Sequence, residues 1–166
     1  MRWALAIAAL IAGAAQPVLA LECLLRDAVY IQPETGYSLA FVPVDPERHP
    51  MQASNAFALV PPGTEAKLLG DVVWGNGESR PLGALRYGCP DPASYEAERA
   101  CTHWQGVIYS FGAGEVRLLP AEDQPAPEQI LLPNLGQVLR YSQVLFDLRL
   151  GEIPWDVFRI ERCNGQ

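Results

Sequence analysis

Hydrophobic and polar residues alternate with a period of two in several short stretches of this chain. Such alternation predicts half-buried antiparallel strands, with apolar side chains inside and polar side chains outside. In 107–111 it places Val107, Tyr109 and Phe111 on the apolar face. The predicted strands are 37–42, 107–111, 115–118, 143–150 and 156–163.

Turn residues separate the strand-like stretches. Gly75-Asn76-Gly77 follows an apolar run at 72–74, and Asn-Gly is a preferred pair for a two-residue hairpin turn. Gly112-Ala113-Gly114 predicts a second hairpin. About eight closely spaced strands predict a mainly β fold, either an antiparallel sandwich or a small barrel. The sequence leaves these two architectures open.

One or two short helices complete the prediction. In 91–100, Asp91 is the expected N-cap and Pro92 the first helical residue. In 133–141, apolar residues fall on one side of a helix, although Gly136 weakens this interpretation because glycine is a poor helix former.

The first twenty residues predict a secretory signal. Arg2 precedes an uncharged apolar run, Pro17 ends it, and Val18-Leu19-Ala20 supplies a small-residue cleavage site. The alternative, an uncleaved anchor, is disfavoured because the run is too short to span a bilayer comfortably. We therefore predict a signal peptide at 1–20, a single β-rich domain at 21–166 with an acidic, proline-rich loop at about 120–128, and a periplasmic or secreted location. No later stretch predicts a membrane span.

The charge of the processed chain limits its partners. Without Arg2, 11 of the 12 basic residues remain against 19 acidic ones, which gives a net charge of −8. Lys67 is the only lysine. A chain this acidic lacks the basic surface that nucleic acids require. A basic partner remains compatible, although acidity by itself usually serves solubility.

Four cysteines follow the predicted signal. An even count in an exported chain predicts two disulfides. Three pairings are possible. We favour Cys89–Cys101, which closes a short loop, and Cys23–Cys163, which joins the two ends of the domain.

The sequence assigns no catalytic residue. His103 follows Cys101 at a spacing of two, which suits a Cys–His pair or part of a zinc site. Oxidised cysteines serve neither purpose, so we expect no metal and no cofactor. No serine lies in a G-x-S-x-G motif.

Paired carboxylates are the one catalytic arrangement that the composition permits. Asp147 and Glu161 are expected on neighbouring strands, where the alternative is an ordinary charged outer face of the sheet. Other neighbouring acids are Glu96 with Glu98 and Glu122 with Asp123.

The stretch from 74 to 104 collects aromatic residues and arginines, which dominate binding hot spots. The alternative places its two tryptophans in the core. A third tryptophan, Trp155, is expected to be buried at the base of the last strand. The candidate binding residues are Trp74, Arg80, Arg86, Tyr87 and Trp104.

One short segment resembles a known family. Gly83-Ala84-Leu85-Arg86-Tyr87, with Cys23 and Cys163 near the ends, is similar to the Ser-Gly-x-Arg-Tyr loop and terminal disulfide of small periplasmic inhibitors of c-type lysozyme, which are eight-stranded barrels. Here the serine is missing and one residue is inserted, so no site residue is transferred.

The sequence therefore predicts an exported, non-catalytic domain that binds a protein or a component of the cell envelope. An envelope hydrolase with paired carboxylates and a lysozyme-inhibitor-like protein are the alternatives.

Overall fold

The computed structural model describes residues 23–47, 53–74, 80–90 and 94–165. The predicted signal at 1–20, the Asn-Gly turn at 75–77 and the expected N-cap Asp91 lie outside these residues. The described elements are η1 (Leu25–Asp27), β1 (Ala28–Ile31), β2 (Ser38–Val42), β3 (Ala53–Val60), β4 (Leu68–Val73), β5 (Leu82–Arg86), α1 (Tyr95–Ala100), β6 (Thr102–Gly106), β7 (Tyr109–Gly112), β8 (Glu115–Leu118), β9 (Gln129–Leu131), α2 (Leu135–Arg140), α3 (Gln143–Asp147) and β10 (Val157–Cys163).

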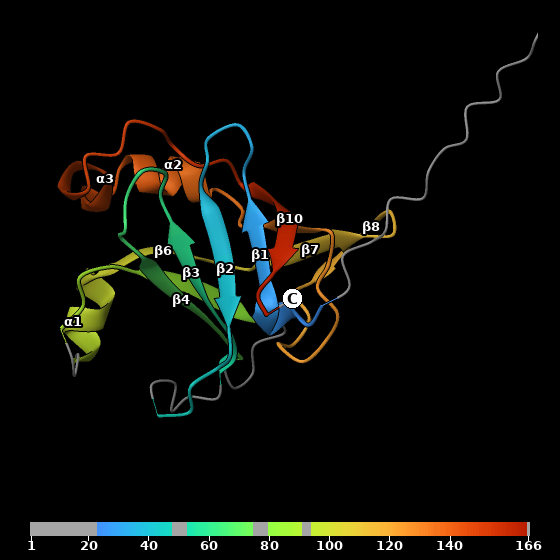
Figure 1. Ribbon diagram of the computed structural model, residues 1–166. Helices are drawn as coiled ribbons and strands as arrows, with labels where there is room; N and C mark the ends of the chain where they lie inside the picture. The colour runs from blue at the N-terminus through green and yellow to red at the C-terminus, as the bar shows by residue number, and fades with distance from the viewer. Residues whose placement is uncertain (1–22, 48–52, 75–79, 91–93, 166) are drawn as a thin grey trace, which may run out of the picture.

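The strands form one antiparallel sheet in the order β6-β5-β4-β3-β2-β1-β10-β9-β7-β8. The first six strands are an up-and-down meander, and β10 is inserted between β1 and β9. The edge strand β6 continues into β7 through only Val107 and Ile108, so the sheet curls into a half-barrel (Figure 1). The predicted antiparallel, mainly β fold is confirmed as a single curled sheet.

The core fills the concave side of this sheet. In β2 alternate residues such as Leu39 are buried there, whereas in β3 every residue from 55 to 59, Phe57 among them, is buried. Gly70 lies opposite Phe57 in the β3–β4 register, and a Cβ at Gly70 would approach the Phe57 ring to 2.3 Å. Glycine at this position therefore makes room for a large aromatic ring in the core.

The predicted strands at 37–42 and 156–163 and the pairing of strands that are adjacent in the sequence are confirmed. The stretch 37–42 contains β2, and 156–163 contains β10. β7 and β8 form the predicted hairpin, in which both Ala113 and Gly114 have positive φ angles. β4 and β5 pair antiparallel on either side of the predicted Asn-Gly turn.

The strand predicted at 143–150 is wrong, because Gln143–Asp147 forms α3. Ser142 caps this helix by accepting a hydrogen bond from the N–H of Val144 at 3.3 Å. Val144 and Leu148 are also spaced by four residues, so they lie on one helical face, and both pack in or against the core. The alternating pattern was therefore compatible with either period.

Two predicted strand faces also differ from the structure. At 107–111 the buried residues are Ile108 and Ser110, on the face opposite to the one expected. Ser110 is accommodated because its hydroxyl donates to the carbonyl of Leu118 at 3.1 Å. β8 is a strand as predicted, but it is exposed on both faces, with Val116 60% exposed.

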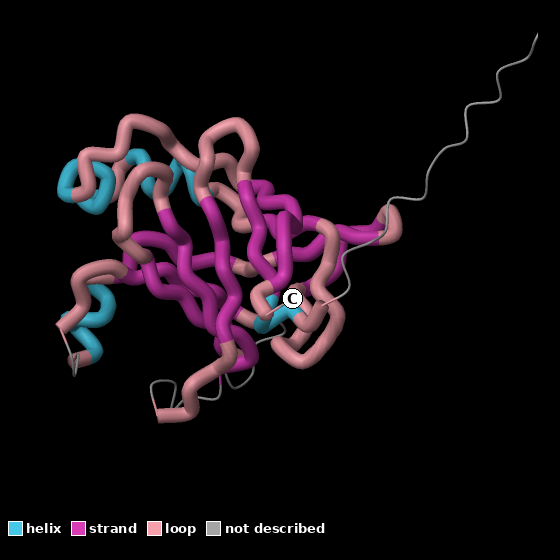
Figure 2. The backbone as a smooth tube through the Cα atoms, viewed as in Figure 1, coloured by secondary structure: helices cyan, strands magenta, loops and turns pink. Residues whose placement is uncertain are grey.

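The helices lie at the rim of the sheet (Figure 2). α2 lies within the predicted 133–141, whereas α1 begins at Tyr95 rather than near 91, because Ser94 caps it by accepting from the N–H of Ala97. Three α-helices are described, not one or two. None of these helices is long and apolar enough to cross a bilayer.

Both predicted disulfides, Cys23–Cys163 and Cys89–Cys101, are present. The loop 120–128 lies beside the first: the N–H of Ala126 donates to the carbonyl of Cys23 at 2.8 Å. Within the described residues, the two ends of the domain and this acidic loop are therefore joined in one place.

Candidate functional site

The five candidate binding residues lie in different environments. Trp104 is only 2% exposed and belongs to the core, so the alternative interpretation is the correct one for this residue. Trp74 is 51% exposed. Arg80 is exposed and donates to the hydroxyl of Tyr109 at 2.9 Å. Tyr87 is half-buried against the core.

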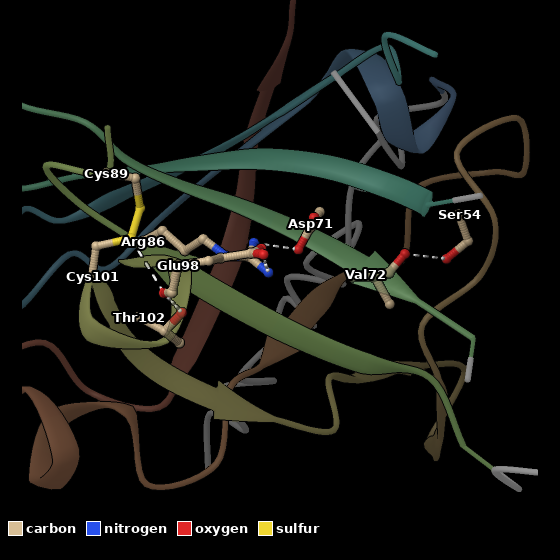
Figure 3. Close-up of polar contacts among 8 residues, drawn as sticks. All are labelled: Ser54, Asp71, Val72, Arg86, Cys89, Glu98, Cys101 and Thr102. Atoms are coloured by element: carbon tan, nitrogen blue, oxygen red, sulfur yellow. Dashed lines mark hydrogen bonds and ion pairs between the residues drawn. A yellow bond between two sulfur atoms is a disulfide. The ribbon is translucent and has the colours of Figure 1, made fainter. Parts of the chain in front are cut away.

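Arg86 holds α1 against the sheet. Its guanidinium lies 2.7 Å from a carboxylate oxygen of Asp71 on β4 and 2.9 Å from one of Glu98 on α1 (Figure 3). The disulfide Cys89–Cys101 fixes the C-terminal end of the same helix. Residues 83–86, which resemble the inhibitor loop, belong to strand β5. Arg86 is thus committed to intramolecular contacts.

We predict that Arg86→Met lowers the free energy of unfolding by about 2 kcal/mol, because it removes the cation beside the largely buried Asp71 carboxylate. The control Glu98→Gln is expected to cost less than about 1 kcal/mol, because the Glu98 side chain is 45% exposed. Urea denaturation measures both. Equal losses for the two variants would contradict this difference.

The acidic residues proposed as catalytic pairs either contact other groups of the protein or lie on elements other than those expected. Asp147 ends α3 and Glu161 lies on β10, so the expectation that they stand on neighbouring strands is wrong. Glu98 is paired with Arg86, and Glu122 accepts the N–H of Val44 at 2.7 Å.

His103 takes part in a contact that the sequence did not indicate. Its Nδ1 lies 2.7 Å from Oγ of Ser142, and its Nε2 lies 3.4 Å from the carbonyl oxygen of Tyr87. Both contacts are satisfied when Nε2 carries the proton and Ser142 donates to Nδ1. Cys101 is in a disulfide, so it forms no thiol pair with this histidine. Across the described ranges, no group of three potential metal ligands is found.

An open hollow of about 730 Å³ lies at the end of the sheet where α2 packs. α2, Thr35, Tyr141 and the segment 151–157 line it. Two aromatic side chains at this hollow are largely exposed, Tyr141 at 81% and Trp155 at 65%. The expectation that Trp155 is buried beneath the last strand is therefore wrong. Exposed aromatic residues gathered at one hollow are a mark of a binding site.

The backbone that carries Trp155 is held by a buried amide. The side chain of Gln32 is fully buried, and its Oε1 accepts the N–H of Trp155 at 2.9 Å. Its Nε2 donates to the carbonyl of Trp155. Thr35 donates to the same Oε1 at 2.7 Å, which fixes the orientation of the amide. Both main-chain groups of Trp155 are thus used, so the exposed indole stands on a rigid support.

The rest of the segment 151–157 is fixed by further contacts. The hydroxyl of Tyr37 donates to the carbonyl of Glu152 at 2.8 Å. Burial, and secondarily the Glu152 carboxylate, raise the pKa of Tyr37 to about 12, so this donor stays protonated at physiological pH. The carboxylate of Asp156 accepts the N–H of Asn134 at 2.8 Å and that of Gly136 at 3.4 Å. Asp156 therefore connects the segment to the first turn of α2.

The polar side chains at the hollow can both donate and accept hydrogen bonds. Gln137, Arg140 and Glu152 line it and are exposed. Asp156 is half-buried, with both carboxylate oxygens engaged by α2. Among the described lining residues, one cation and two carboxylates therefore share the hollow with the aromatic rings. This combination suits binding of a polar ligand with apolar faces.

Sequence reasoning missed this site because its parts are far apart in the chain. Trp155 follows Ile153 and Pro154, a local context that resembles a core segment. The one available signal was the spacing of Gln137, Arg140 and Tyr141, which places them on one face of the predicted helix at 133–141. The contact between Gln32 and Trp155, 123 residues apart, leaves no local signal.

No protein family, no curated protein and no solved structure matches this chain.

Proposed function

We propose that this chain is an exported, non-catalytic domain that binds a component of the cell envelope in the hollow beside α2. The observation that carries the proposal is the pair of exposed aromatic rings, Tyr141 and Trp155, at one hollow, where the buried amide of Gln32 holds the backbone of Trp155 in place. Large exposed rings scattered singly over a surface need no explanation, whereas two gathered at one hollow mark a binding surface.

Export agrees with the covalent structure. The two disulfides are compatible with a periplasmic or extracellular location, where cross-links of this kind form and persist. The predicted signal at 1–20 would take the chain there. The net negative charge is consistent with a partner other than nucleic acid.

The absence of an assigned catalytic pair favours binding over hydrolysis. Asp156 is the second carboxylate at the hollow, and both of its oxygens accept N–H groups of α2. Glu152 is then left without a carboxylate partner that is free to act with it among the described lining residues. A two-carboxylate mechanism needs two groups that reach the substrate.

The proposal predicts that Trp155→Ala and Tyr141→Ala each weaken binding of the oxidised protein to isolated envelopes by about ten-fold or more, because each removes a large contact ring. Cosedimentation with washed envelopes measures this. Phe146→Ala and Tyr95→Ala are matched controls, since both rings are more than 70% exposed but lie outside the hollow.

The controls are expected to bind as the unchanged protein does. Equal binding by all five proteins would contradict the proposal, as would an equal loss in Phe146→Ala. Unfolding curves for each variant separate a lost contact from a lost fold.

A further inference from the structure

We infer that the ligand of the hollow is a glycan, bound by stacking of its sugar rings on Trp155 and Tyr141. The inference rests on the proposed function, since it specifies the chemistry of the component bound there. It comes from the combination of exposed aromatic faces with hydrogen-bonding side chains at one open hollow.

The aromatic rings of the hollow suit the faces of a sugar ring. A pyranose ring has apolar C–H faces, and its hydroxyl groups lie mainly around its edge. The electron-rich face of an aromatic ring attracts the slightly positive hydrogens of such C–H groups. Trp155 and Tyr141 are largely exposed at the hollow, and the main chain of Trp155 is fixed through Gln32. An exposed ring on a fixed main chain can receive a sugar without rearrangement of the backbone.

The polar side chains of the hollow suit the hydroxyl groups at the edge of a sugar ring. Hydroxyl groups both donate and accept, so they need partners of both kinds. Arg140 offers donors, Glu152 offers acceptors, and the amide of Gln137 offers both. All three are exposed at the hollow. A stacked sugar would therefore find partners for its edge on the same surface.

The charge and shape of the hollow disfavour two other ligand classes. A phosphate or an acidic lipid headgroup would meet two carboxylates, Glu152 and Asp156, against the single cation Arg140. A hydrocarbon chain needs an enclosed apolar pocket, whereas this hollow is open and bordered by polar groups. Its volume of about 730 Å³ suits an oligosaccharide rather than a folded domain.

The test is titration of the purified oxidised protein with soluble ligands by calorimetry and tryptophan fluorescence. The probes are chitohexaose and cellohexaose as uncharged glycans, and a lysine-rich decapeptide as a basic polymer. We expect saturable binding of at least one glycan, weakened ten-fold or more by Trp155→Ala or Tyr141→Ala and unchanged by Phe146→Ala. Trp155→Phe keeps an aromatic face, so it is expected to bind within about three-fold of the unchanged protein while losing the fluorescence change.

The outcomes separate this inference from the proposed function. If envelopes bind through Trp155 but neither glycan does, the glycan assignment is overturned and the binding function stands. Binding of the basic peptide alone at the hollow overturns it as well. If a glycan binds through Trp155 but envelopes do not, the glycan assignment is supported and the envelope function is overturned.

Discussion

Replacing Cys23 and Cys163 together by serine is expected to lower the free energy of unfolding by about 5 kcal/mol, the largest effect of any substitution considered for this protein. The two cysteines are 140 residues apart, so their bond closes a loop that spans nearly the whole described chain. A cross-link between distant residues removes more conformational entropy from the unfolded chain than a short one does. It also anchors the end of β10 beside the start of β1.

The matched control is the double serine variant of Cys89 and Cys101. These residues are only 12 apart, and the chain-entropy estimate for their loop is about 3 kcal/mol. Urea denaturation of the oxidised proteins gives both values, and the difference between them is the quantity of interest. A larger loss for the short loop would show that packing around α1, rather than loop closure, sets the contribution of these bonds.

The features predicted from the sequence are those that short segments determine by themselves. The β7–β8 hairpin follows from its turn, because glycine at 114 adopts a positive φ angle readily. The favoured disulfide pairing, one of the three that four cysteines allow, is also confirmed, although Cys23 and Cys163 are 140 residues apart. Ser142 shows where local reasoning fails, since a serine that caps a helix turns an alternating stretch into α3.

The candidate site could not be predicted because long-range contacts build it. Arginine is common in binding hot spots, yet the guanidinium of Arg86 forms ion pairs with Asp71 and Glu98. Trp155 has the size of a core residue, yet Gln32 holds its backbone so that the ring faces solvent. In both cases the partner lies in another segment of the chain, so the role of the side chain depends on the fold.

Gly136→Ala is expected to destabilise the protein by about 3 kcal/mol, although helix propensity alone predicts a gain of about 1 kcal/mol. Gly136 lies in the first turn of α2, and a Cβ there would lie 2.1 Å from the carbonyl oxygen of Pro154. A backbone carbonyl cannot move aside as a flexible side chain does, so α2 and the segment 151–157 must separate. The hydrogen bonds from Asn134 and Gly136 to Asp156 are then lost.

The Gly136→Ala variant therefore tests whether the hollow depends on the close approach of α2 to the carbonyl of Pro154. Gly151→Ala is the matched control, because Gly151 also lines the hollow but a Cβ there meets nothing within 4 Å. It should change the unfolding free energy by less than about 0.5 kcal/mol. Gly136→Ala should lose both stability and binding, since Trp155 is displaced with its segment. A more stable Gly136→Ala protein would mean that propensity outweighs the contact with Pro154, and that the support of the hollow is looser than the geometry indicates.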